Sequence, residues 1–187
     1  MKKFIISIII IIVLFGAKYL FDRKYYTGKE IDSFNDVRVY YNGNPKNING
    51  RNLTKDGYNL GLKYQCVEFV KRYYFEHLNH KMPNSYGHAK DFYNRETIDG
   101  KINYSRNLLQ YNNPSISKPK VNDILVFDKS TFNKFGHVSI VSKIYENSIE
   151  VVQQNVFLST RENYDLKFVD GKWELDNKRI LCWLRKD

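Results

Sequence analysis

The hydrophobic pattern separates the first 21 residues from the rest of the chain. An apolar run from Phe4 to Ala17 is broken only by Ser7, and a second apolar patch ends at Phe21. Apolar residues would lie on every side of such a helix, unlike the helices of soluble domains, which carry a single stripe. At about 1.5 Å of rise per residue the stretch can just cross a thin hydrocarbon core. The pattern predicts an export segment at 1–21.

We expect this segment to stay in place as a membrane anchor. A cut after Ala17 would put Phe15 where cleavable signal peptides carry a small residue, which disfavours cleavage. A cleaved signal peptide is the alternative. Basic residues flank both ends of the apolar stretch, so charge gives only weak evidence of orientation. We expect a linker at 22–34 and a domain at 35–187 outside the cytoplasm, anchored or secreted.

The remaining chain changes from loops to one helix and then to strands. From Arg23 to Gly61 it is polar and rich in glycine, with only Val37–Tyr41 patterned as a strand. Helical spacing then predicts an amphipathic helix from about Gln65 to His80, with a less regular helix at 87–95. Its apolar stripe comprises Cys66, Phe69, Val70, Tyr73 and Tyr74, and its other face carries Glu68, Lys71 and Arg72.

Strand patterns dominate the second half. They cover Asp123–Phe127, His137–Ile144, Ile149–Val156, Leu166–Val169 and Ile180–Leu184. Helices followed by a run of strands predict an α+β fold with a mostly antiparallel sheet.

Composition narrows the class of protein. With 187 residues, 42% of them hydrophobic, the chain suits one domain with a sizeable core, and we expect a monomer. A net charge of +10 favours an anionic partner, although a solvated basic surface is the simpler interpretation. No nucleic-acid-binding motif is recognised, so we expect no nucleic-acid partner.

The two cysteines have different settings. Cys182 lies within the apolar run 180–184 and is interpreted as a core residue, although a bridge to Cys66 is an alternative. Cys66 begins the predicted helix, where unpaired amides and the positive end of the dipole favour a thiolate. Cys66 is therefore a candidate nucleophile, the other interpretation being a buried residue of the apolar stripe.

His137 is the candidate base for that nucleophile. It follows Gly136 and opens a predicted strand, whose end can present an imidazole to a helix terminus. The remaining histidines, His77, His80 and His88, lie among polar residues without a metal-ligand pattern, so we expect them at the surface and expect no metal.

A third group must orient the imidazole. If the strand from His137 returns through a three-residue loop at 145–147, Ile144 faces Ser148 and His137 faces Asn155, with Gln153 on the same side. A two-residue loop would instead place Gln154 there. The run 153–155 of three amides is unusual within a strand, which favours the first register; an exposed strand end is the other interpretation.

Four segments together resemble the CHAP domain, a family of cysteine- and histidine-dependent amidohydrolases and peptidases on a papain-like scaffold. The resemblance covers about 35–187, and its most specific parts are the Gln-Cys helix start and the Gly-His strand. The segments are 64–72 (YQCVEFVKR), 118–127 (KPKVNDILVF), 136–141 (GHVSIV) and 152–155 (VQQN).

The resemblance implies roles for particular residues. Cys66 would be the nucleophile, His137 the general base, Asn155 or Gln153 the orienting group, and Gln65 a contributor to the oxyanion site. The family often has Glu where Gln153 stands and Gly where Asn122 stands. Thiol catalysis of this type needs no cofactor.

The resemblance also implies substrates. Family members cleave peptidoglycan amides, and a related branch cleaves glutathionylspermidine or trypanothione. The segment 64–69 is more like the second branch, whereas export and positive charge favour the cell wall, so we expect peptidoglycan. The non-enzymatic alternative is a basic, tyrosine-rich module that binds an anionic polymer through the same surface.

Overall fold

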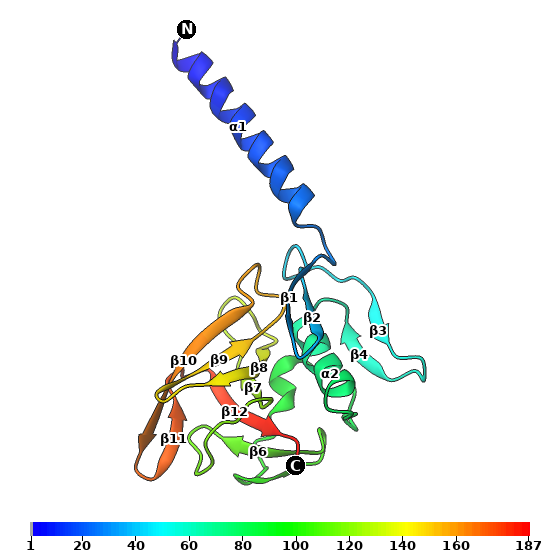
Figure 1. Ribbon diagram of the computed structural model, residues 1–187, viewed down its shortest axis with the longest axis vertical. Helices are drawn as coiled ribbons and strands as arrows, with labels where there is room; N and C mark the ends of the chain where they lie inside the picture. Colours follow the sequence, from blue (N-terminus) through cyan, green and yellow to red (C-terminus); the bar gives the residue numbers. More distant parts are fainter. Residues whose placement is uncertain (1) are drawn as a thin grey trace.

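A long apolar helix stands apart from a compact α+β domain. The computed structural model describes residues 2–187, and helix α1 (Lys2–Lys24) projects away from the domain, as Figure 1 shows. Among the described residues one helix, Phe4–Lys24, is long and apolar enough to cross a membrane, and none of its most apolar window is buried. The predicted N-terminal apolar helix is confirmed.

The domain is built around one eight-stranded sheet in which every pairing is antiparallel. The predicted α+β class is therefore confirmed. The strands run in the spatial order β11 (Lys172–Leu175), β10 (Arg161–Val169), β9 (Ser148–Val152), β8 (His137–Ile144), β7 (Ile124–Phe127), β12 (Ile180–Arg185), β6 (Leu108–Asn112) and β5 (Lys101–Asn103).

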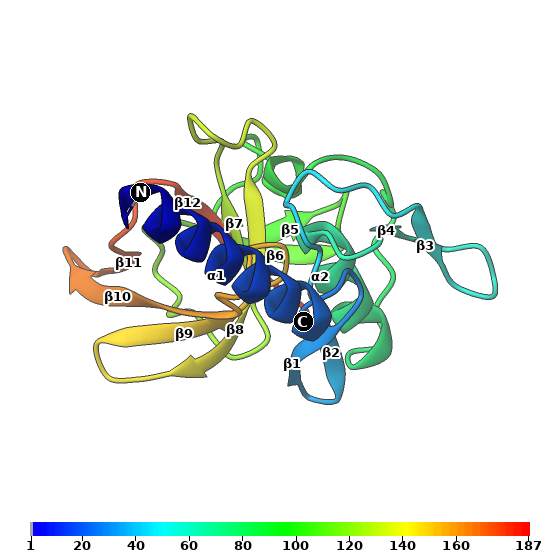
Figure 2. The ribbon, with the colours of Figure 1, turned by 90° about the horizontal axis from the view of Figure 1, so that it is seen from above.

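Two small hairpins and helix α2 (Cys66–Glu76) lie beside the sheet. The hairpins are β1 (Glu30–Phe34) with β2 (Val37–Tyr40), and β3 (Arg51–Leu53) with β4 (Asn59–Leu62). Helix α2 contacts β2 and β4 on one side and β8 on the other, so it lies between the hairpins and the sheet (Figure 2).

The apolar stripe of α2 forms the main core. Phe69, Val70, Tyr73 and Tyr74 are fully buried and join a cluster with side chains of β7 and β8, including Ile140. Each buried side chain of this size contributes about 1.5–3 kcal/mol. A second cluster on the opposite face of the sheet includes Trp183, Leu125 and Val151. The central strands β7, β8 and β12 are thus buried on both faces, and α2 packs against β8 within this core.

The polar face of α2 is also buried, although the amphipathic pattern placed it opposite the apolar stripe. Glu68, Lys71 and Arg72 are only 2%, 1% and 6% exposed. Arg72 Nε lies 2.6 Å from Glu68 Oε1, and the Lys71 ammonium donates to the carbonyls of Asn59 and Ser85. The hairpins cover this face, and buried charges persist there because each is paired or hydrogen-bonded.

The structure differs from the sequence-based elements mainly in irregular regions. The second helix is only a short 3-10 turn, η1 (Ala89–Phe92), and strands β1, β3, β4, β5, β6 and β11 were not predicted. All of these strands are three to five residues long, so they carry little hydrophobic periodicity. β1 lies inside the expected linker at 22–34.

Gly136, immediately before β8, occupies a position that only glycine fits. Its φ is +76°, and a Cβ there would lie 2.5 Å from the Phe127 carbonyl oxygen and 2.9 Å from Lys90 Cβ. Gly171 has φ +77° with nothing within 4 Å of an added Cβ. A side chain substituted at either glycine would be strained by the positive φ, but only at Gly136 would it also be crowded.

We therefore expect Gly136→Ala to destabilise the domain more than Gly171→Ala. The control substitution carries the left-handed penalty of about 1–2 kcal/mol, whereas Gly136→Ala adds an overpacking cost of about 1–3 kcal/mol. Urea unfolding of both variants measures the difference. Equal losses of unfolding free energy would show that β7 and η1 do not crowd Gly136.

Candidate active site

Cys66 is the first residue of α2 and its thiol is almost buried. Gln65 precedes it in extended conformation (φ −87°, ψ 159°), and the helical bonding begins with the Phe69 amide on the Gln65 carbonyl at 3.1 Å. The sulfur lies close to the backbone N–H groups of Val138, Val67 and Cys66 itself. The helix start and the beginning of β8 therefore meet at this thiol.

His137 begins β8, and its backbone is followed directly by the Val138 amide that faces the thiol. The ring is partly buried and tilts against Phe127, its neighbour on β7, with ring centroids 5.8 Å apart. The start of β8, which carries the predicted base, and the start of α2, which carries the predicted nucleophile, are thus brought together through the Val138 amide.

Gln153 fixes the orientation of the His137 ring. The ring Nε2 lies 2.9 Å from Gln153 Oε1, while Gln153 Nε2 donates to the Ser159 carbonyl and to Glu162 Oε2, both at 3.1 Å. Because the amide hydrogens are used by two acceptors, Oε1 must face the imidazole and accept from Nε2–H. In the neutral ring Nδ1 then carries the free lone pair, the state that a general base requires.

The β8–β9 hairpin reaches this arrangement by a different path from the one expected. Ile144 pairs with Ile149 rather than Ser148, so the loop is longer by one residue. A bulge at Ser142 absorbs the difference, since Ile140 then pairs with Val152, as the expected register required. Gln153 consequently lies on the His137 side of the sheet.

Asn155 does not lie against the His137 ring, in contrast to the expected alignment. The ladder of β9 ends at Val152, and Asn155 turns away with φ +70°. Its Nδ2 donates to Gln65 Oε1 at 2.6 Å and its Oδ1 accepts from Asn42 Nδ2 at 2.9 Å. Asparagine tolerates the left-handed conformation better than most residues, so the chain can turn away from the sheet at Asn155.

Gln65 is likewise turned away from the thiol. Its Nε2 donates to the carbonyls of Asn47 at 2.8 Å and Pro45 at 3.2 Å, so both amide hydrogens are used in the loop at 42–50. In this conformation the side chain has no hydrogen left for an oxyanion. The first-turn amides of α2, which lack acceptors within the helix, remain as donors.

Gln154, the alternative orienting residue, points to the opposite side. It donates to Glu68 Oε2 at 3.0 Å and to the Gln65 carbonyl at 3.1 Å, and accepts from the Tyr40 amide at 2.7 Å. It therefore joins β9 to β2 and to the start of α2, behind the site.

Sequence reasoning missed Glu162. The pairing of Val151 with Glu162 brings this β10 residue beside Gln153, where its carboxylate holds the amide. No spacing or motif in the sequence indicates this residue, because Glu162 lies near the site only as a result of the pairing of β10 with β9.

Burial keeps both reactive groups neutral at rest. It raises the pKa of the Cys66 thiol, although the nearby backbone amides act in the opposite direction. It lowers the pKa of His137 to about 4, opposed by the Gln153 hydrogen bond and the Glu162 charge and reinforced by Arg179. The site therefore holds a thiol and a free imidazole rather than a preformed ion pair.

The remaining chemistry-bearing residues lie elsewhere. Both cysteines are free and Cys182 is buried in β12, so the alternative bridge is excluded. His80, expected at the surface, is only 7% exposed and bonds the Arg106 carbonyl at 2.9 Å, whereas His77 and His88 are exposed. Within residues 2–187 no group of three His, Cys, Asp or Glu could hold a metal ion.

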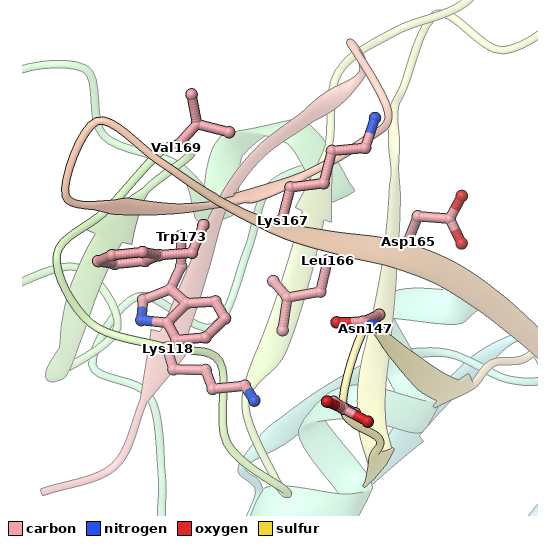
Figure 3. A pocket seen from close by; sticks show the side chains of 9 residues that line it. Lys118, Asn147, Asp165, Leu166, Lys167, Val169 and Trp173 are labelled. Carbon is pink, nitrogen blue, oxygen red and sulfur yellow. The ribbon is translucent and has the colours of Figure 1, made fainter.

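A large surface hollow is also separate from the site. About 780 Å³ in volume, it lies along the β10–β11 hairpin between Trp173, Lys118 and Asn147 (Figure 3). Neither Cys66 nor His137 lines it.

One family departure has a structural explanation. Asn122, where the family often has glycine, adopts φ +77°, a conformation that asparagine tolerates better than other side chains. Its carbonyl accepts from Tyr74 Oη at 2.8 Å and its Oδ1 from Tyr73 Oη at 2.7 Å. Asparagine thus preserves the turn and adds contacts to α2.

Exchanging the charge around Gln153 should change the pKa of His137. In the double variant Gln153→Glu/Glu162→Gln a carboxylate replaces the amide beside Nε2–H at constant net charge, which should raise the pKa of His137 by about 1–3 units. NMR titration of the ring measures it. Glu162→Gln alone is the control and should lower this pKa, because the Glu162 charge raises it. An unchanged pKa in the exchange variant would contradict the geometry.

The neutral imidazole of His137 predicts a loss of stability in acid. Its pKa is lowered from 6.5 to about 4 on folding, so the unfolded chain binds a proton before the folded protein does. The contribution of His137 is present above pH 6.5 and is lost as pH falls toward 4. Urea unfolding across this window should show a steeper loss for the wild type than for His137→Gln. Parallel curves would contradict this pKa.

Comparison with known proteins shows the family to which the chain is similar. The CHAP domain model matches residues 55–155, a stretch that contains Cys66, His137, Gln153 and Asn155. The chain is 31% identical over 149 residues to the bifunctional glutathionylspermidine synthetase/amidase of Escherichia coli (strain K12), covering 72% of this chain and 23% of that protein.

Trypanothione synthetase of Crithidia fasciculata is 24% identical over 144 residues, which cover 74% of this chain and 22% of that protein. The chain thus spans less than a quarter of the length of these relatives. Because the CHAP model covers more than half of the chain, including the thiol, the imidazole and the amides around them, the chain belongs to the CHAP domain family.

Proposed function

We propose that this protein hydrolyses amide bonds by covalent catalysis, with Cys66 as nucleophile, His137 as general base and Gln153 as the group that orients His137. Membership of the CHAP family supports amidase or peptidase activity. The carrying observation is the 2.9 Å hydrogen bond between His137 Nε2 and Gln153 Oε1, at the start of the strand whose next amide, that of Val138, lies beside the Cys66 thiol.

The proposed reaction begins with proton transfer from the Cys66 thiol to His137 Nδ1 as sulfur attacks the amide carbon. The C–N bond then breaks, and Nδ1 gives its proton to the leaving amine. Water, deprotonated by the same nitrogen, hydrolyses the thioester and restores the thiol. The Gln153 carbonyl accepts from Nε2–H throughout, which stabilises the imidazolium formed in each half-reaction.

Backbone amides at the start of α2 would stabilise the oxyanion. The Cys66 and Val67 N–H groups lie beside the sulfur and belong to the first turn, where the helix offers no internal acceptor. One such donor contributes about 3 kcal/mol in comparable sites. Gln65 would act by holding the loop at 42–50, because its amide hydrogens are bonded to Asn47 and Pro45.

The apolar helix α1 favours peptidoglycan peptides as substrate. It has the length and composition of a membrane span, which would hold the domain at a membrane, and we propose the outer side, where that polymer lies. The net charge of +10 suits an anionic polymer.

The relatives favour a second substrate. Both named relatives act in glutathionylspermidine or trypanothione metabolism by their names, and one is named as an amidase. A glutathionylspermidine-type amide is therefore the second candidate, hydrolysed through the same residues.

Substitution at the proposed nucleophile and base tests the mechanism. We expect Cys66→Ala and His137→Ala each to reduce hydrolysis of the productive substrate by at least about 10³-fold, as loss of either member does in related triads. Purified peptidoglycan and glutathionylspermidine are supplied separately, with product amines measured.

Cys182→Ala is the matched control, since it removes the second buried thiol, in β12 and two strands away from β8, and should retain activity. Wild-type rates in Cys66→Ala or His137→Ala would refute the mechanism. Cleavage of glutathionylspermidine alone would reject the wall substrate and leave the mechanism standing.

A further inference from the structure

The end of the apolar helix packs on the loop that leads from the active site. Phe21, the last residue of the predicted apolar segment, stacks on Phe157 with ring centroids 5.9 Å apart and planes at 9°. Tyr41 contacts Phe157 at 5.9 Å and Tyr25 at 6.1 Å, edge to face in both cases. Figure 1 shows α1 leaving the domain at this end. Phe157 therefore contacts the C-terminal end of the candidate membrane span.

This aromatic junction is connected to the active site by a short chain of contacts. Phe157 follows Asn155 by two residues, and Asn155 Nδ2 bonds Gln65 Oε1 at 2.6 Å. Gln65 directly precedes Cys66, and Gln153, at the start of the same loop, bonds His137. If α1 crosses a bilayer, the reactive thiol lies close to the headgroups.

The surface around the junction has the composition of a membrane interface. Three large side chains on these segments are exposed: Tyr26 at 57%, Phe157 at 55% and Ile48 at 73%. We call this surface, with exposed Lys24 and Lys46, the junction face. Aromatic and basic side chains are typical of the lipid headgroup region.

The same segments carry few acidic residues, which favours contact with anionic headgroups. The loops at 43–50 and 155–160 contain no Asp or Glu. The acidic residue at the end of α1, Asp22, is paired with Lys18 at 2.5 Å. Like-charge repulsion from an anionic bilayer is therefore small on this face, and each lysine near the surface contributes about 1 kcal/mol of attraction.

We propose that the junction face rests on the headgroup layer of the bilayer that α1 crosses, so that the active site acts on amides held at the membrane surface. The substrate part rests on the proposed amide hydrolysis and names its class: peptide amides carried by a lipid-anchored molecule, in preference to freely diffusing fragments. The docking part depends only on α1 and the junction face.

Fluorescence quenching by lipid tests the docking. The full chain is reconstituted in phosphatidylcholine and phosphatidylglycerol vesicles, with or without bromine on the acyl chains. We expect Phe157→Trp and Ile48→Trp each to gain emission, above the wild-type background of Trp173 and Trp183, that brominated lipid reduces at least twofold. Tyr104→Trp, 82% exposed in the turn between β5 and β6, is the control and should not be quenched.

Quenching at 157 and 48 no stronger than at 104 would overturn the proposal, including the case in which the face is covered by a second copy of the chain. Because the quenching measurement involves no catalysis, it tests the docking proposal even if the proposed function is wrong. Each probe replaces an exposed side chain, and circular dichroism of the variants confirms that they fold.

A spacer tests the substrate class. A Gly-Ser insert of about 30 residues between Lys24 and Tyr25 spans about 30 Å as a flexible chain and frees the domain from α1. On peptide amides tethered to lipid in the same vesicles we expect at least a fivefold loss of rate, whereas the rate on the water-soluble peptide stays unchanged. Equal rates on the tethered peptide would overturn the substrate class, while a wild type that cleaves neither peptide would refute the proposed function instead.

Discussion

The structure depends on the packing of helix α2 against strand β8. Buried aromatic and aliphatic side chains of α2 pack on Val138 and Ile140, and this contact brings the first turn of the helix to the first residues of the strand. The Cys66 thiol lies beside the amide of Val138, the residue after His137, because two regular elements with few internal degrees of freedom are held by a core. Sites on such elements are positioned more firmly than sites on loops.

A layer of amides and charges supports that contact from behind. Glu68 bonds Arg72, Asn52 and Gln154, so a buried carboxylate joins α2 to the small hairpins and to the end of β9. The consecutive amides after β9 have three different tasks: Gln153 orients His137, Gln154 bonds Glu68, and Asn155 bonds Gln65. Each polar group is satisfied, which is the condition for burying a polar network beside a core.

Burial also sets the chemistry. The raised pKa of the Cys66 thiol and the lowered pKa of the His137 imidazole both favour the neutral forms at neutral pH, so slow alkylation of Cys66 would be compatible with catalysis. The neutral Gln153 contributes less to imidazolium stability than the glutamate often found in the family. Glu162 supplies a negative charge one hydrogen bond further away, through its bond to the Gln153 amide.

The sequence alone determined the elements with strong periodicity: the apolar helix, α2 with Cys66 at its start, β8 with His137 at its start, and the α+β class. These elements follow from the local spacing of apolar residues, because burying one face of a helix or strand requires a period of about 3.6 or 2 residues. Tertiary structure alone decided that Glu68, Lys71 and Arg72 are buried, and that Glu162 lies behind Gln153. It also decided that Asn155 bonds Gln65 instead of His137, because one bulge and one left-handed residue redirect a strand end. Such contacts join residues far apart in sequence, so no local pattern encodes them.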